Sequence, residues 1–227
     1  RVRQSEAYDW NEVIAFHNKE DGGHDQPWLR YLAGENPTHP ERILQASYQQ
    51  VVQRLAVIRE DTEVGTNHRE HRWQETNPVT TEGLIQLILG APQPIYNGGL
   101  LFARLGYFDT RRQRPGLPPD VAALVEKLEA RRTVLHLVNL NPIEGRELII
   151  QAGAFGEHRF GSARYSALTS EFPPAPADYA APPVRSETRT AAVDGTRLKV
   201  ELPPGTEITL DLDTERFVGE PSYARPG

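Results

Sequence analysis

Residues 121–140 have the sequence VAALVEKLEARRTVLHLVNL, and the spacing of their apolar side chains changes near the two arginines in the middle. Before the arginines, the apolar residues recur at the three-and-four spacing of one helix face; they are Val121, Leu124, Val125 and Leu128. After them, residues 133–140 carry apolar side chains on both faces of a period-two pattern, which is typical of a buried strand. The change predicts a helical part that ends near residue 132 and a β part that begins there.

The helical prediction extends upstream from this point. The clearest helix is expected for residues 38–61, where Thr38, Pro40 and Glu41 have the spacing of a capping box with proline in the first turn. Its apolar face consists of Ile43, Leu44, Tyr48, Val51, Val52, Leu55 and Ile58. Shorter helices are predicted for residues 27–32, 79–89, 100–107 and 118–128.

The β prediction extends downstream. Apolar and polar residues alternate over 198–202 and again over 207–212, on either side of a Pro203-Pro204-Gly205 turn, which predicts an amphipathic hairpin. Further strands are expected at 147–151, 158–160 and 164–168, and a proline-rich connection at 172–184. The fold class predicted is therefore α+β. A helical domain of antiparallel helices (1–132), compatible with part of an α/α toroid, is followed by an antiparallel β-sandwich (133–227).

Composition limits the function classes. The net charge of −6 argues against nucleic acid as a partner, and no window approaches the 18 apolar residues of a membrane span. The absence of cysteine excludes disulfides, thiolate metal sites and a cysteine nucleophile. The chain also lacks methionine, so we expect it to be processed or to be a C-terminal fragment of a longer protein. Composition leaves the cellular compartment open.

Two polar clusters are candidate sites for acid–base chemistry. His24 and Asp25, near His17 and Asp21, have the side chains for proton transfer or for binding a divalent metal, although their spacing matches no zinc motif. His68, Glu70 and His71 form the second cluster, in which the two histidines share a face if the segment is helical. The competing interpretation of both clusters is a solvated loop.

A third candidate is a set of aromatic residues that stack on sugar rings if they are exposed. Its members are Trp28, Trp73 and Tyr96, with Asn97 beside them, and Trp10 and Tyr31 as further rings. The competing interpretation is that these are ordinary core or boundary residues. Residues 151–160, by contrast, contain glycines that predict a bend at a strand end, and a structural role for Glu157, His158 and Arg159.

The order of parts from residue 38 onward resembles the C-terminal region of large bacterial carbohydrate-active proteins, in which a helical toroid is followed by a closing β-sandwich. The stretches that carry the resemblance are Leu137–Pro142, Gln151–Phe160, Leu202–Thr206, Glu215–Phe217 and Pro221–Tyr223. None of them is a catalytic signature, so no active-site residue is carried over. The resemblance implies that catalytic carboxylates lie upstream of Arg1, in another domain of the same parent chain.

The sequence thus predicts the C-terminal part of a glycoside hydrolase or of a polysaccharide lyase-like enzyme, with a carbohydrate partner and no cofactor. The alternative is a non-catalytic module that binds glycan or protein, or that serves assembly. No pair of carboxylates for glycoside hydrolysis can be identified within the chain.

Overall fold

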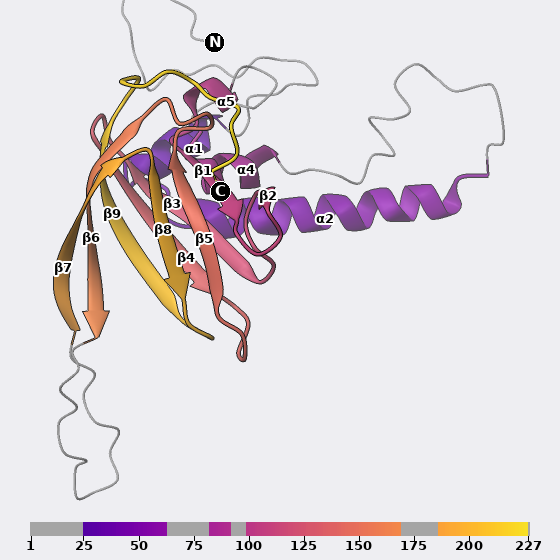
Figure 1. The fold of residues 1–227 in the computed structure, drawn as a ribbon. Coiled ribbons are helices and arrows are strands. Elements are labelled where there is room, and N and C mark those ends of the chain that lie inside the picture. Colours follow the sequence, from indigo (N-terminus) through magenta and orange to yellow (C-terminus); the bar gives the residue numbers. More distant parts are fainter. Residues whose placement is uncertain (1–24, 63–81, 92–98, 169–185, 227) are drawn as a thin grey trace, which may run out of the picture. The chain divides into compact units, whose positions relative to one another are not determined.

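The computed structural model describes residues 25–62, 82–91, 99–168 and 186–226 (Figure 1). The chain forms two compact units. The first consists of Arg1–Leu87 with Ala91–Gly99, and the second of Ile88–Gly90 with Leu100–Gly227. Each unit is described separately below.

Helices make up the described part of the first unit. They are α1 (Asp25–Leu32), α2 (His39–Glu60) and α4 (Glu82–Leu89), the last of which ends in the second unit. The helix predicted for residues 38–61 is confirmed as α2, although Thr38 forms no capping hydrogen bond through its side chain. Proline in the first turn and Glu41 near the helix N-terminus remain as its start signals. α4 ends at Leu89, the predicted end of the helix expected for residues 79–89, and Gly90 follows it with a φ of +62°, which does not continue a helix.

The described part of the second unit consists of the short helix α5 (Gly99–Phe102), at the unit boundary, and nine strands in two antiparallel sheets (Figure 1). One sheet has the order β2-β1-β5-β8 and the other has the order β3-β4-β9-β6-β7. The strands are β1 (Leu105–Asp109), β2 (Arg114–Pro115), β3 (Val121–Leu128), β4 (Arg132–Asn139), β5 (Arg146–Ala152), β6 (Arg159–Leu168), β7 (Ser186–Gly195), β8 (Arg197–Leu202) and β9 (Glu207–Glu215).

The hydrophobic core lies between the two sheets, so the unit is a β-sandwich. Every second residue of the central strands points into it, such as Leu148 and Ile150 of β5 and Leu210 and Leu212 of β9. The two strands predicted on either side of Gly205 are confirmed as β8 and β9, but the predicted hairpin is wrong, because these strands belong to different sheets and do not pair with each other. The alternation was visible because one face of each strand is solvated.

The predicted fold class is wrong, because the described residues contain no half-chain of antiparallel helices and more of them lie in strands than in helices. The largest error is the helix expected at 118–128, which is strand β3. This strand buries Val121 and Val125, as a period of two requires, and then its register to β4 shifts between Val125 and Lys127. The bulge brings Leu128 opposite the buried Thr133. Two short alternating runs joined by a bulge thus imitate the spacing of a helix face.

A second correction concerns residues 100–107. Only Gly99–Phe102 is helical, and Leu105 already belongs to β1, which pairs with β5. Leu105 and Tyr107 are both buried, and Gly106 between them separates their side chains in a two-residue period. Among the described residues, no helix is long and apolar enough to cross a membrane.

Candidate functional site

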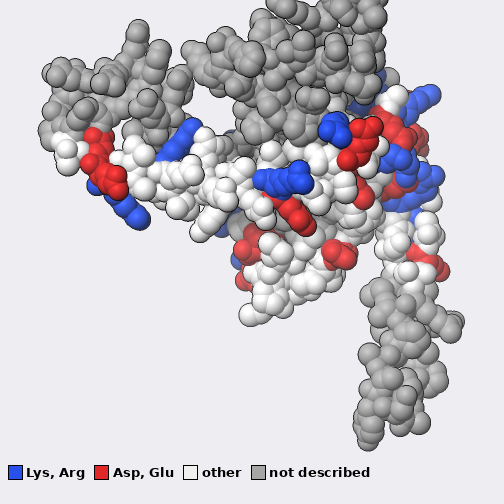
Figure 2. Space-filling model, turned by 180° about the vertical axis from the view of Figure 1, so that it is seen from behind, with Lys and Arg blue, Asp and Glu red and all other residues white. Residues whose placement is uncertain are grey.

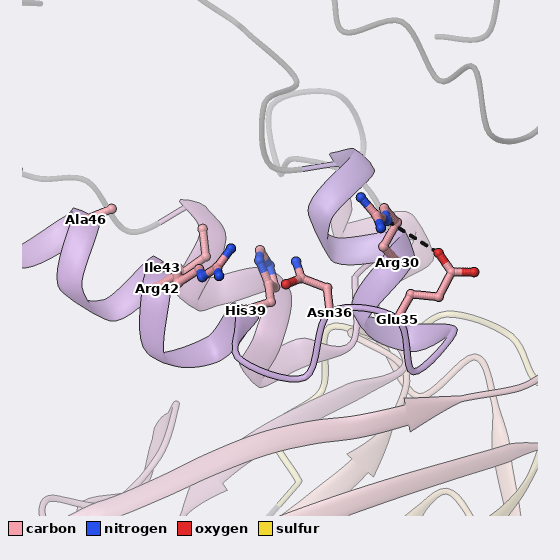
Figure 3. Close-up of a pocket in the computed structure, with 7 residues that line it drawn as sticks. All are labelled: Arg30, Glu35, Asn36, His39, Arg42, Ile43 and Ala46. Atoms are coloured by element: carbon pink, nitrogen blue, oxygen red, sulfur yellow. Dashed lines mark hydrogen bonds and ion pairs between the residues drawn. The ribbon is translucent and has the colours of Figure 1, made fainter.

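A pocket of about 640 Å³ lies in the first unit, around the turn between α1 and α2 (Figure 3). Its lining is mostly polar and comes from three short stretches of chain: Arg30, Glu35, Asn36, His39, Arg42, Ile43 and Ala46. Gly34, with a φ of +81°, ends the first helix and lets the chain reverse toward the second. The turn thereby places side chains of both helices around one cavity.

Two guanidinium groups and one carboxylate determine the charge of this pocket. Arg30 forms an ion pair with Glu35, with 3.3 Å between Nε and Oε2, and both side chains are exposed. Arg42, one turn into α2, is also exposed and forms no ion pair within the described residues. Its charge lies at the N-terminal end of α2, where the helix dipole adds to the positive potential. The pocket therefore favours an anionic ligand over a cationic one.

His39 is the buried wall of the pocket. Its ring lies beside two aromatic rings, with centroids 6.4 Å from Trp28 and 5.9 Å from Tyr31. Those two rings stack on each other at 5.7 Å. In Figure 3, Asn36, His39 and Arg42 lie next to one another, while Arg30 is turned toward Glu35. The two aromatic rings hold the imidazole in place. A ligand in the pocket would therefore contact mainly the polar side chains next to His39, which are Asn36 and Arg42.

Most of the residues predicted for the site lie outside the described part of the chain. These are His24, His68, Glu70, His71, Trp73, Tyr96 and Asn97. Asp25 begins helix α1. Trp28 is fully buried, whereas a ring that stacks on a sugar has to expose one face. The residues that form the pocket were missed, because arginines and an asparagine near a helix start form no recognisable motif.

A second polar arrangement lies on the outer face of the five-stranded sheet. His136 of β4 is hydrogen-bonded to Glu126 of β3 (Nε2 to Oε2, 2.6 Å) and to Thr209 of β9 (Nδ1 to Oγ1, 2.9 Å). The order hydroxyl, imidazole, carboxylate is that of a catalytic triad. The histidine lies on the middle one of three paired strands, however, and its side chain is partly exposed. A sheet ladder occupies the backbone N–H groups that an oxyanion hole needs, so we interpret the three side chains as a cross-strand contact.

A third polar cluster is buried in the second unit. It contains Arg104, Glu157 and His158, each less than one-twentieth exposed. Burial lowers the pKa of Arg104 to about 10, with Arg216 adding to the effect. Three of their atoms have no hydrogen-bond partner within the described part of the chain: Nε of Arg104, Oε1 of Glu157 and Nε2 of His158. Across the described ranges, no group of three His, Asp or Glu side chains is arranged to hold a metal ion.

Comparison with known proteins gives one result. A family model described as "Domain of unknown function (DUF8034)" matches residues 1–85, which include the pocket residues and the N-terminal part of the chain. No curated protein and no solved structure matches the chain. The comparisons therefore assign no activity, and the chemistry of the pocket has to carry any functional proposal.

Proposed function

We propose that this chain is the β-sandwich end of a carbohydrate-active protein and that its first unit binds an acidic sugar. The observation that carries the proposal is the pocket around Arg30, Asn36 and Arg42, which combines two guanidinium groups with an amide. A guanidinium group pairs with a carboxylate through two parallel hydrogen bonds. An amide both donates to and accepts from sugar hydroxyls.

An acidic sugar, such as a uronate, fits this set better than a neutral one. Arg30 already forms an ion pair with Glu35, so we expect Arg42 to provide the main contact to the carboxylate of the ligand. The volume of about 640 Å³ is in the range of small-molecule sites and is sufficient for one or two sugar rings. In this proposal the pocket only binds the sugar, and the catalytic carboxylates belong to another domain of the parent enzyme.

Calorimetry with oligogalacturonate and with an uncharged oligosaccharide of equal length tests the proposal. The acidic ligand should bind, and Arg42→Gln should weaken it about tenfold, the effect of losing one charge-assisted contact. Arg59→Gln is the matched control, since Arg59 is an exposed arginine of the same helix outside the pocket. Equal binding of both ligands, or equal losses in both variants, would refute an acidic-sugar site. Unsaturated product absorbing in the ultraviolet would indicate a lyase rather than a binding module.

A specific observation favours a second candidate, an assembly module. Helix α2 carries apolar residues at intervals of four, three, four and three, the spacing of a coiled-coil seam: Leu44, Tyr48, Val51, Leu55 and Ile58. Leu44 and Tyr48 are 59% and 69% exposed. No charged residue lies between Arg42 and Arg54, and much of the helix surface in Figure 2 is uncharged.

A heptad seam is completed by another helix of the same kind, so the second copy of this chain is the expected occupant. Light scattering then shows a dimer that Leu44→Asp converts to a monomer, while Gln49→Asp, on the opposite side of the helix from the seam, does not. A monomeric wild-type protein at micromolar concentration would rule this candidate out.

A further inference from the structure

The C-terminal residues 216–225, here called the C-terminal strap, lie against the loop that joins β5 to β6. The backbone N–H of Gly219 donates to the carbonyl oxygen of Glu157 at 3.2 Å, and the N–H of Ser222 donates to that of Phe155 at 2.8 Å. The rings of Phe155 and Tyr223 lie 5.2 Å apart. The strap is therefore held by a few separate contacts and belongs to no sheet.

His158 provides the contact that depends on protonation. The backbone N–H of Phe217 donates to its Nδ1 at 3.1 Å, and the Phe217 ring meets the imidazole edge-on at 4.7 Å. His158 is fully buried. Because Nδ1 accepts a hydrogen bond, the imidazole is neutral and carries its proton on Nε2. The closed strap thus requires an uncharged His158.

The groups that face His158 oppose its protonation on balance. Burial lowers the pKa of His158, the carboxylate of Glu157 raises it, and the charges of Arg104 and Arg216 lower it again. The result is a pKa below the ordinary histidine value of 6.5. The Oε1 of Glu157 lies 4.0 Å from Nε2 of the imidazole, which is too far for a hydrogen bond, and neither atom has a hydrogen-bond partner among the described residues.

We propose that His158 makes the C-terminal strap a pH-sensitive latch, closed while the imidazole is neutral and released when it takes up a proton. If Nδ1 takes up a proton from solvent, it becomes an N–H donor that faces the backbone N–H of Phe217, and the hydrogen bond between them is lost. The resulting imidazolium is buried and repelled by the charges of two arginines, which favours a state in which Phe217 has moved away and water reaches the ring. The remaining contacts of the strap among the described residues include two backbone hydrogen bonds, the pair of rings of Phe155 and Tyr223, and a hydrogen bond from Nη2 of Arg197 to the carbonyl oxygen of Arg225 at 3.4 Å.

The sign of the effect follows from the lowered pKa. As the pH falls below 6.5, a freed imidazole binds a proton more readily than the buried one. Mildly acidic solution therefore lowers the free energy of the open strap relative to that of the closed strap. Above pH 7 both states are neutral at His158, and the latch stays closed.

A single label on the strap provides the test. The chain contains no cysteine, so Ala224→Cys, at an exposed strap position, can be labelled uniquely with a fluorophore. We expect the anisotropy of the label to be high at pH 8 and to fall as the pH is lowered below 6.5, while circular dichroism of the sheets stays constant. An unchanged anisotropy, or a fall only when the sheets unfold, would overturn the proposal.

Two substitutions at the exposed Arg216 separate the charge from its packing on Phe217. Arg216→Gln removes a charge that opposes protonation, so the midpoint of release should rise by a few tenths of a pH unit. Arg216→Lys keeps the charge and should leave the midpoint unchanged. His158→Gln, which still offers an acceptor to Phe217, should abolish the transition if it folds. Equal midpoints for the glutamine and lysine variants would contradict the role of His158, whatever the third variant does.

Discussion

A Cβ atom on Gly153 would overlap the carboxylate of Glu157, which folds back over the loop between β5 and β6. The Oε2 of this carboxylate accepts a hydrogen bond from the N–H of Phe155 at 2.7 Å, so the side chain cannot easily swing away. Gly153 also has a φ of +86°, in the region that disfavours residues with a side chain. Conformation and space therefore both require glycine at this position.

Gly153→Ala is expected to lower the free energy of unfolding by about 3 kcal/mol, the sum of a backbone strain of about 1 kcal/mol and the displacement of a buried carboxylate. Urea unfolding followed by circular dichroism measures it. Gly205→Ala is the matched control, because Gly205 has a φ of +60° and no atom of the described residues lies within 4 Å of its Cβ position. That control should cost only about 1 kcal/mol. Similar losses in both variants would mean that Glu157 moves without cost.

A different prediction concerns Asp211, which joins three strands of the larger sheet. Arg132 donates to it through Nε (2.8 Å) and Nη2 (3.0 Å), and Arg164 donates to it at 2.9 Å. The hydrogen bonds from Arg132 are the main reason why the pKa of Asp211 lies below its ordinary value of 3.8. Because both arginines are partly exposed, Asp211→Asn should cost only about 1 kcal/mol at pH 7.

The pH dependence of that difference gives the sharper test. A carboxyl group with a lowered pKa in the folded state stabilises the protein fully above pH 3.8, and this contribution is lost as the pH falls through the folded-state value. Wild type and Asp211→Asn should therefore converge in acid. Asp213→Asn, at an exposed position of the same strand without a salt bridge among the described residues, should follow the wild type at every pH. A constant gap down to pH 2.5 would show that charge is not the cause.

Sequence periodicity identified the elements whose pattern is long or one-sided. Helix α2 has 22 residues with a repeated apolar face, and the strands around Gly205 alternate cleanly because one of their faces is in water. Periodicity did not identify the strands whose apolar pattern is short or interrupted. β3 contains a bulge, and β7 has hardly any buried residue to mark it, so neither strand produced a recognisable alternation.

The candidate site was harder to predict than the fold, for a physical reason. Histidines and tryptophans were chosen as candidates because of the chemistry of their side chains. Trp28, however, is a core residue, and most of the other candidates lie outside the described residues. The pocket depends instead on Arg30 and Arg42, which share a cavity only because the chain turns at Gly34. Such a juxtaposition depends on the path of the backbone and has no fixed spacing in the sequence. The buried Glu157 and His158, in contrast, fall in the stretch for which a structural role was predicted.

Asn139 carries the last prediction, because its side chain connects two turns at one end of the sandwich. Its Nδ2 lies within hydrogen-bonding distance of the carbonyl oxygens of Glu144 (2.9 Å), Pro203 (3.0 Å) and Leu202 (3.2 Å), and its Oδ1 accepts from the N–H of Asn141 at 3.0 Å. An amide has only two hydrogens, so two of the three carbonyl groups share one of them.

Asn139→Ala removes all these contacts from a buried site and leaves carbonyl groups without a donor, so it should cost about 3 kcal/mol of unfolding free energy. Asn139→Asp retains the acceptor for Asn141 but loses the donor and faces three carbonyl oxygens, so it should be at least as damaging above pH 5 and less so in acid. Chemical denaturation at pH 4 and pH 7 distinguishes these effects. If the aspartate variant were as stable as wild type at pH 7, the amide would not be the group that holds the two turns together.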